Sequence, residues 1–311
     1  MIMSQYPIGT SGQKWGEKER ALWLANQSVK RSYHAEVEAK IELLASDFIV
    51  ENYGTLAYET GDYQLWAIKS PNWSNTKQTL LVTGGVHGYE TSGVQGAIRF
   101  AQTKMSAYAQ HVNILVLPCL SPWGYETINR WNPEAIDPNR SFYANSPAQE
   151  SVLAMAYVAG LGDDIDIHID LHETTDTDNS EFRPALAARD GITQNNWNIP
   201  DGFYLVGDSE NPQPAFQLAM IEAVAKITHI APADENGEII GAPVEQHGVI
   251  NYAYKPLGLC AGLSNARFTT TTEVYPDSPK VDDENCILAQ VAAITSGLDY
   301  VINQQASSQA L

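Results

Sequence analysis

The sequence is poor in positively charged residues. Its 311 residues include 18 Lys and Arg against 37 Asp and Glu, which gives a formal net charge of −19 at pH 7. A chain this acidic repels a nucleic-acid backbone and an anionic membrane surface at long range. The composition therefore argues against nucleic acid and membrane as partners. The acidic surplus is interpreted first as a source of solubility and second as a means of attracting cationic substrates.

Cysteines are scarce, and long apolar runs are missing. The three cysteines, Cys119, Cys260 and Cys286, lack the short spacing of a thiolate zinc site and are interpreted as buried thiols. The N-terminus lacks the basic start and continuous apolar core of a secretory signal, and no run approaches the length of a membrane span. We therefore expect a soluble protein of a reducing, cytoplasmic compartment. The sequence leaves its oligomeric state open.

The apolar residues follow the periods of alternating strands and helices. Hydrophobic residues make up 44% of the chain, which suits a globular protein with a sizeable core. Residues 17–46 predict one or two helices, and short strands follow at 55–60 and 64–70. After these, the pattern predicts strands at 79–85, 112–119, 164–172 and 266–274, and helices near 91–110, 148–160, 214–227 and 284–302.

This order predicts an α/β fold. Strands that alternate with helices form a mixed, mostly parallel β-sheet flanked by helices on both faces. No internal repeat divides the chain, so residues 1–311 are expected to form a single domain, with residues 1–75 as an N-terminal extension of helices and edge strands packed on it. The tail at 303–311 is expected to fray. Functional groups gather beyond the carboxyl ends of the strands in such sheets.

Candidate metal ligands follow the strand at 79–85. His87 and Glu90 stand three positions apart just beyond it, in the stretch VHGYE. A loop or a first helical turn can bring two such side chains to one side. Alone, the pair is more typical of a surface loop. A zinc hydrolase needs three protein ligands and a fourth position for water, so a third ligand must come from elsewhere.

The strand at 164–172 offers that third ligand. Its apolar and polar residues alternate with period two, which is typical of a strand. His168 and His172 are then roughly 13 Å apart, at about 3.3 Å per residue, so only one of them can bind a given ion. His172 is preferred because it ends the strand. His168 is interpreted as a buried group, either in the core or supporting the site.

The loop at 120–142 carries polar groups suited to an anionic substrate. Arg130 and Arg140 stand in it with Asn139 and other asparagines. The planar fork of an arginine fits a carboxylate, and a permanent cation beside a metal suits an oxyanion. Surface salt bridges are an equal alternative from these residues alone.

Taken in order, these stretches resemble the zinc carboxypeptidase family, the group that includes pancreatic carboxypeptidase A. The family pattern is His-x-x-Glu, Arg-x-Asn, Asn-Arg, a lone His that ends a strand, and a Glu near the C-terminus. The turns SPWGYE and DPNRSF and the strand TTTTEVYPD are also similar to family segments. The matching residues are His87, Glu90, Arg130, Asn132, Asn139, Arg140, His172 and Glu273.

The resemblance implies a zinc carboxypeptidase-like catalytic domain with one Zn²⁺ ion. His87, Glu90 and His172 would hold that ion. Asp137 would orient the first zinc histidine, because a carboxylate behind a ligand fixes its tautomer.

The resemblance also implies the catalytic and substrate-binding groups. Arg130 would stabilise the oxyanion, and Asn139 and Arg140 would grip the carboxylate of a substrate. Glu273 would act as general base and then as general acid. The expected activity is that of a metallocarboxypeptidase, which releases the C-terminal residue of a peptide.

Two positions depart from the family pattern or match it loosely. Glu173 follows His172 where the family has a small polar residue, and it would either favour a cationic substrate group or cap the next turn. The family has a mobile Tyr some twenty residues before the catalytic Glu. Tyr252 and Tyr254 are the candidates, either as substrate-binding residues or as packed aromatics.

Two other functions stay open. The stretches VHGYE and IDLHE are similar to the acyl-amino-acid deacylase branch of the family, which includes aspartoacylase and succinylglutamate desuccinylase. A deacylase would use the same zinc chemistry on an N-acyl-amino acid that has a free carboxylate. A non-catalytic carboxylate-binding or metal-sensing protein is the third alternative, although pure binding needs no base such as Glu273.

Overall fold

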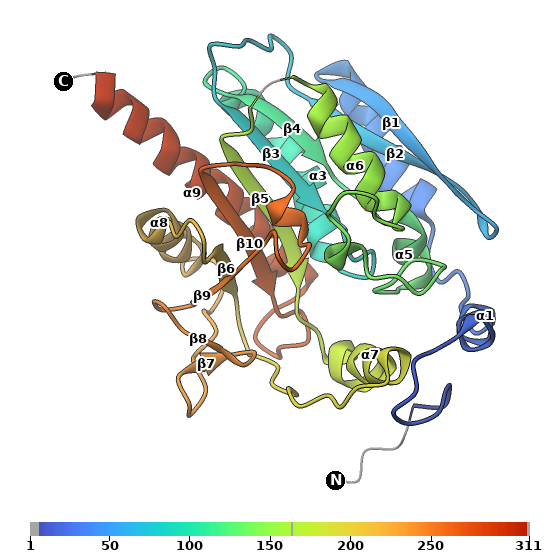
Figure 1. The fold of residues 1–311 in the computed structure, drawn as a ribbon. Coiled ribbons are helices and arrows are strands. Elements are labelled where there is room, and N and C mark those ends of the chain that lie inside the picture. The colour runs from blue at the N-terminus through green and yellow to red at the C-terminus, as the bar shows by residue number, and fades with distance from the viewer. Residues whose placement is uncertain (1–5, 163, 310–311) are drawn as a thin grey trace.

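The computed structural model describes residues 6–162 and 164–309. Its centre is a mixed sheet whose eight described strands run in the order β1-β2-β4-β3-β5-β10-β6-β9 (Figure 1). The central pairs β4–β3, β3–β5 and β5–β10 are parallel, as is β6–β9. The other pairs are antiparallel. The strands are β1 Ile49–Tyr58, β2 Gly61–Lys69, β3 Thr79–Gly84, β4 Asn113–Leu117, β5 Ile167–Glu173, β6 Tyr204–Asp208, β9 Val249–Tyr252 and β10 Phe268–Val274, with a separate ribbon of β7 Glu238–Ile239 and β8 Ala242–Pro243.

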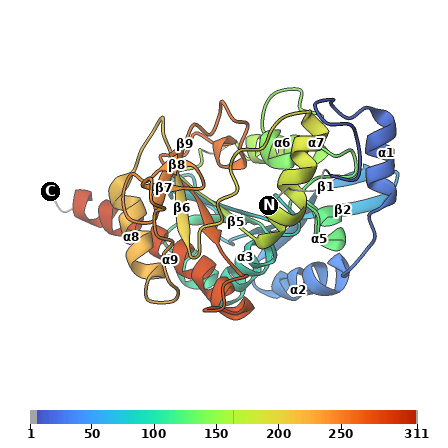
Figure 2. The ribbon, with the colours of Figure 1, turned by 90° about the horizontal axis from the view of Figure 1, so that it is seen from below.

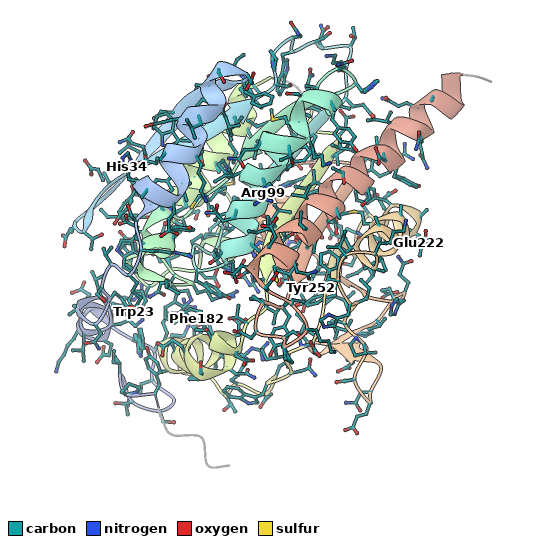
Figure 3. The ribbon with its side chains drawn as sticks, turned by 180° about the vertical axis from the view of Figure 1, so that it is seen from behind. Trp23, His34, Arg99, Phe182, Glu222 and Tyr252 are labelled. Atoms are coloured by element: carbon teal, nitrogen blue, oxygen red, sulfur yellow. The ribbon has the colours of Figure 1, made fainter. Side chains whose placement is uncertain are left out.

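Helices cover both faces of the sheet. One face packs against α2, α3, α8 and α9, which lie in front of the sheet in Figure 3. The other face packs against α6, which lies in front in Figure 1. β3, β4 and β5 are buried at every position, because both of their faces are covered. The longer helices are α1 Glu17–Ala25, α3 Thr91–Thr103, α5 Pro122–Thr127, α6 Gln149–Gly160, α7 Arg183–Asp190, α8 Pro214–Val224 and α9 Asp283–Gln309. The short helical turns are η1 His34–Glu38, α2 Ala39–Glu42, η2 Leu43–Ser46, α4 Met105–Tyr108, η3 Pro138–Arg140, η4 Asp178–Phe182 and η5 Cys260–Gly262.

The N-terminal segment is built into the domain. β1 and β2 form the antiparallel edge of the sheet, and α1 lies beside α7 at one end of the molecule (Figure 2). A cluster of tryptophans from distant parts of the chain joins these elements, with Trp23 and Trp131 at a ring distance of 5.5 Å. The segment that precedes α1 also contacts α7, where Trp15 N donates to Arg189 O at 2.8 Å.

The predicted α/β fold is confirmed, and its details differ in places. The helix expected at 91–110 is split between α3 and α4, and the helical region at 17–46 is interrupted at residues 26–32. The described tail continues α9 as far as Gln309, so the expectation that the chain frays from residue 303 was wrong there. α9 has the length and composition of a membrane span over Asp283–Ala306, but half of that window is buried against the rest of the protein.

Candidate metal centre and catalytic cavity

The candidate ligands meet at the carboxyl ends of two neighbouring strands. β3 has β4 on one side and β5 on the other. The connections that leave β3 and β4 therefore run in opposite directions along the sheet, and the strand order reverses between β3 and β5. Ligands of open α/β sheets bind at such a point. His87 and Glu90 follow β3, and His172 lies near the end of β5.

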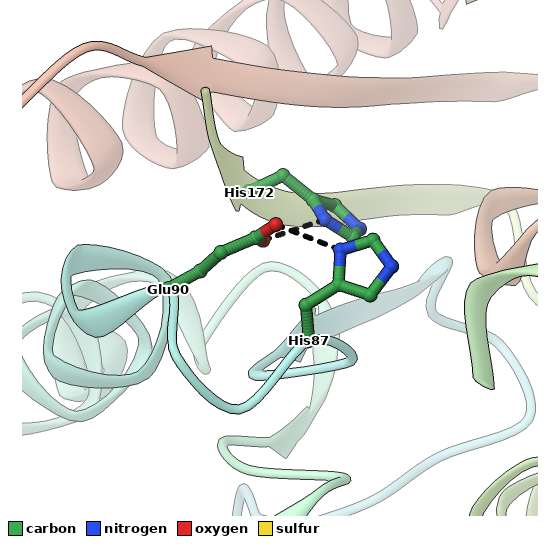
Figure 4. Close-up of side chains that lie close together, drawn as sticks. All are labelled: His87, Glu90 and His172. Atoms are coloured by element: carbon green, nitrogen blue, oxygen red, sulfur yellow. Dashed lines mark hydrogen bonds and ion pairs between the residues drawn. The ribbon is translucent and has the colours of Figure 1, made fainter. Parts of the chain in front are cut away.

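The three predicted metal ligands converge (Figure 4). His87 Nδ1 lies 2.7 Å from Glu90 Oε1, and His172 Nδ1 lies 2.7 Å from Glu90 Oε2. One ligand atom from each of the three residues lies within 4.8 Å of the others, and all three side chains are buried. Burial alone would raise the pKa of Glu90, but the two imidazoles lower it to about 2.

The donor set fits a divalent transition-metal ion. Glu90 Oε2 is buried and makes no hydrogen bond within the described residues, although it stands at ion-pair distance from His172. A buried carboxylate oxygen without a hydrogen bond is costly unless a cation completes its surroundings. Two imidazole nitrogens and one carboxylate form the His₂Glu set of catalytic zinc sites, which leaves a position for water.

A carboxylate lies behind each histidine. His87 Nε2 is 3.0 Å from Asp137 Oδ1, and His172 Nε2 is 2.8 Å from Asp170 Oδ2. Both rings therefore present Nδ1 to the candidate metal, because the carboxylates engage the other nitrogen. Asp137 has the position expected of it, whereas Asp170 was not singled out from the sequence. Its place on the same face of β5 as His172, two residues away, was the signal available.

Asp170 is itself fixed by a buried polar network. Thr83 Oγ1 donates to Asp170 Oδ1 at 2.6 Å, and His168 Nε2 lies 3.0 Å from the same hydroxyl. Burial lowers the pKa of His168 to about 4, which favours the neutral ring. Cys260 also contacts Thr83 and is buried, as expected of a structural thiol. His168 is thus a hydrogen-bonded group of the interior that supports the site.

The loop that carries His87 and Glu90 depends on a glycine. A Cβ at Gly88 would lie 2.1 Å from Tyr125 N and 2.4 Å from Ser121 O, so the loop packs directly on the backbone at the start of α5. Only a residue without a side chain permits that approach.

The loop between β4 and α6 brings its polar groups to the same place. Arg130 Nε donates to Asp137 Oδ2 at 3.1 Å, which links the predicted oxyanion group to the carboxylate behind His87. Asn139 is buried; its Oδ1 accepts from Cys260 N at 2.8 Å, and its Nδ2 lies 3.4 Å from His172 Nε2. Arg140 is exposed to the cavity and donates from Nη1 to Asn139 O at 2.6 Å.

Glu273 stands next to the metal ligands. Parallel pairing of β10 with β5 sets its Cα opposite that of His172. Thr174 Oγ1 donates to Glu273 Oε2 at 3.0 Å, and the Tyr204 hydroxyl lies 2.7 Å from the same Oγ1. Burial raises the pKa of Glu273 to about 8, although the nearby His172 opposes this shift. A bound cation would lower it again by charge attraction.

The two tyrosines have different positions. Tyr252 is half-buried and lines the cavity. The structure contradicts the substrate-binding prediction for Tyr254, which is fully buried and donates its hydroxyl to Val206 O. β9 ends at Tyr252, so the alternation that would put both side chains on one face does not extend to Tyr254.

Glu173 acts as a helix cap. Its two oxygens accept from Thr91 N at 3.1 Å and Ser92 N at 2.6 Å, at the start of α3. A carboxylate is favourable at a helix N-terminus because the unpaired N–H groups and the dipole attract it. Glu173 therefore caps α3 and not the turn that follows it in the sequence. Burial raises the pKa of Glu173 to about 7.

A cavity of about 490 Å³ opens over these groups. Its floor holds the metal ligands and Glu273, and one wall is formed by η4 and α7. Residues of that wall that were not anticipated from the sequence are Phe182, Arg183, Leu186 and Arg189.

One known family model matches the part of the chain that carries the candidate metal ligands. The model of the succinylglutamate desuccinylase/aspartoacylase catalytic domain matches residues 76–194. This range contains the three candidate ligands and both loop arginines but ends before Glu273. No curated protein matches the sequence.

Solved structures show the same fold. A candidate metallopeptidase from Shewanella amazonensis has 20% identity and a TM-score of 0.65, covering 88% of this chain and 98% of its own. A metallo-carboxypeptidase from Pseudomonas aeruginosa in complex with (2-guanidinoethylmercapto)succinic acid has 14% identity and a TM-score of 0.57, covering 93% and 69%. Bovine thrombin-activatable fibrinolysis inhibitor, solved with tick carboxypeptidase inhibitor, has 12% identity and a TM-score of 0.57, covering 94% and 99%.

The family match covers less than half of the chain but includes the candidate ligands, and the solved structures share the whole fold. Within residues 76–194 the chain is similar to the succinylglutamate desuccinylase/aspartoacylase catalytic domain, and its fold is similar to that of metallo-carboxypeptidases.

Proposed function

We propose that this protein is a zinc-dependent metallocarboxypeptidase that hydrolyses the C-terminal peptide bond of its substrate. The observation that carries the proposal is the meeting of three features in one cavity: a His₂Glu ligand set, Glu273, and Arg140, which forms no ion pair within the described residues. The ligands and the glutamate suit hydrolysis, and the arginine suits a terminal carboxylate.

Arg140 is the group that would select a chain end. Its guanidinium is exposed to the cavity, and its hydrogen bond goes to the neutral Asn139 carbonyl. It forms no ion pair with any described carboxylate. A peptide carboxylate can therefore accept from its free N–H groups in a bidentate arrangement.

Glu273 would move the protons. Zinc, when bound, lowers the pKa of a coordinated water to about 7 and polarises the scissile carbonyl. Glu273 can accept a proton from the attacking water and then donate it to the leaving nitrogen, which makes the amine a good leaving group. The hydroxyl of Thr174, 3.0 Å away, orients the Glu273 carboxylate for both transfers.

Arg130 would meet the negative charge that develops on the carbonyl oxygen. Asp137 holds its Nε at 3.1 Å, and Asp178 lies 3.7 Å from its Nη1. Nη2 has no hydrogen-bond partner in the described part of the chain and can donate to the oxyanion. A fixed donor of this kind contributes about 3–4 kcal/mol to the transition state.

A second candidate is a zinc-dependent N-acyl-amino-acid deacylase. The match of residues 76–194 to the succinylglutamate desuccinylase/aspartoacylase model favours it. Both enzymes hydrolyse an amide next to a carboxylate, so the same residues serve both. They differ in whether the group on the other side of the bond is a peptide or a simple acyl chain.

A substrate panel tests the proposal. The zinc-loaded protein should release the last residue from peptides with a free C-terminus and leave the matched C-terminal amides intact, because Arg140 requires a carboxylate. Removal of zinc by a chelator should abolish release, and added zinc should restore it. Cleavage of amidated peptides at an equal rate would refute the exopeptidase assignment. Turnover of N-acyl-amino acids without any turnover of peptides would select the deacylase.

A further inference from the structure

We propose that Arg183 determines specificity by binding a second carboxylate of the substrate, in addition to the terminal one. This inference rests on the proposed function and names the substrate class of the same site. The favoured substrates would carry two carboxylates, with the second on the side chain of the C-terminal residue or on the acyl side of the scissile bond.

Arg183 is a cation of the cavity wall that has no carboxylate partner in the described part of the chain. It is the first residue of α7, is partly buried and lines the cavity. Its Nη1 donates to Asn179 Oδ1 at 2.7 Å and to Asn198 O at 2.9 Å, and both acceptors are neutral. No ion pair joins it to a described acidic residue. An arginine stays charged at all ordinary pH values, so a partly buried one without an anion is a site for an anion.

Two other arginines of the cavity, Arg189 and Arg130, are already paired with carboxylates. Arg189 forms a bidentate pair with Asp190 at 2.8 and 2.9 Å, and it stacks on Trp131 with its guanidinium carbon 4.2 Å from the ring centre. Arg130 pairs with Asp137. Neither has the free charge that Arg183 keeps.

The two acidic residues of η4, the turn that precedes Arg183, have other partners. Asp178 accepts from Tyr89 Oη at 3.0 Å and from Thr175 N at 2.8 Å, and it lies 3.7 Å from Arg130 Nη1. Glu181, on the turn before α7, accepts from Tyr6 Oη at 2.6 Å. Within the described residues, the cavity thus holds two arginines without an ion pair, Arg140 and Arg183, in a protein whose net charge is −19. Each of these two arginines can pair with one carboxylate, so a dianion gains a charged contact that a monoanion cannot make.

The N-terminal segment holds η4 and α7, the wall that carries Arg183, in place. Trp15 N donates to Arg189 O at 2.8 Å, and the Tyr6–Glu181 hydrogen bond anchors the preceding turn. A rigidly mounted cation discriminates between ligands better than a mobile one, because it does not lose conformational freedom on binding.

Matched substrates test the assignment. The zinc-loaded parent should cleave hippuryl-glutamate with a kcat/KM about tenfold to hundredfold above that of hippuryl-glutamine, which is the range of a charged hydrogen bond. N-glutaryl-phenylalanine against N-pentanoyl-phenylalanine gives the corresponding comparison for the acyl side. A preference in either pair supports the second carboxylate and identifies its source. No preference in both pairs overturns the proposal.

Variants then assign the preference to Arg183. Arg183→Gln should remove it by lowering the kcat/KM of the dianion and leaving that of the monoanion within about threefold, and Arg183→Lys should restore part of it, since charge alone remains. The matched control is Arg267→Gln, which removes an exposed arginine outside the cavity. Equal losses on both members of a pair would mean that Arg183 only anchors α7, which would refute the assignment.

A binding measurement separates this inference from the activity. In the zinc-loaded Glu273→Gln protein, titration calorimetry with hippuryl-glutamate and hippuryl-glutamine should give the same preference, and a further Arg183→Gln change should remove it. If the parent cleaves no member of the panel, the proposed function fails, and the ratio of the two dissociation constants still decides the role of Arg183.

Discussion

Replacement of Asp170 by Asn should weaken zinc binding without unfolding the protein. Asp170 is buried in β5, with one oxygen 2.8 Å from His172 Nε2 and the other 2.6 Å from Thr83 Oγ1. An Asn has the same shape and can still accept from one of these groups. It removes the negative charge that holds the His172 ring with Nδ1 toward the metal.

The magnitude follows from the single contact that acts on the ligand. Hydrogen bonds to charged groups contribute about 1.5–3 kcal/mol. The bond from Asp170 to His172 is the one that affects zinc affinity, because His172 is a ligand. Loss of a carboxylate behind a metal-binding histidine lowers metal affinity ~10–100-fold, which corresponds to about 1.4–2.7 kcal/mol. The two estimates agree. Asp137→Ala should have an effect of the same size through His87.

Zinc competition with a chromophoric chelator measures the change directly. The matched control is Asp166→Asn, because Asp166 is partly buried just before β5 and accepts from Thr79 N at 2.8 Å, away from the ligands. Thermal unfolding of the metal-free proteins reports any loss of stability separately. A zinc dissociation constant for Asp170→Asn within twofold of the parent, or an equal change in the control, would refute the reasoning.

Three further changes probe the base, a buried acid and the ligand loop. Glu273→Gln should lower kcat about 10²–10⁴-fold with the zinc content unchanged by mass spectrometry, and a variant as fast as the parent would restore the non-catalytic alternative. Burial raises the pKa of Glu150 from 4.5 to about 7, so the folded state binds a proton that the unfolded chain has released. The free energy of unfolding should therefore fall by up to about 1.4 kcal/mol per pH unit from pH 4.5 to 7. Urea unfolding of Glu150→Gln should show a flatter dependence on pH, and a dependence as steep as that of the parent would contradict this explanation. Gly88→Ala places a Cβ 2.1 Å from Tyr125 N and should cost on the order of 1–3 kcal/mol and weaken zinc binding; an unchanged melting temperature would speak against this packing.

The metal ligands could be predicted because their spacing and the period of the strand agree. The alternation at 164–172 placed His168 and His172 on one face but far apart, and this left His172 as the ligand at the strand end. In the structure, His168 reaches the site only through Thr83 and Asp170. That connection depends on rotamers and on the register between β3 and β5, which the sequence of one strand does not contain.

The α7 wall could not be placed from the sequence, although its helix carries local signals. Pro184 stands at the second helical position, and Gly191 follows the last residue with φ of 64°, as is common at helix ends. These signals predict the ends of a helix, but they do not predict which parts of the protein the helix packs against. The role proposed for Arg183 follows from which acidic residues are already paired, and that is a property of the packed cavity.

The position of the catalytic glutamate is set by strand register and not by its distance along the chain. Glu273 and His172 are neighbours because Glu273 pairs with His172 across β10 and β5, as Phe268 pairs with Ile167 five residues earlier. Paired residues of adjacent strands lie about 5 Å apart and point to the same face, whereas a slip by one residue turns the side chain to the opposite face. Threonines at 269–272 occupy the intervening positions, and Thr272 Oγ1 donates to Gln290 of α9 at 2.5 Å on the face away from the cavity. The polar contacts on that far face therefore help to fix the register that brings the base to the metal.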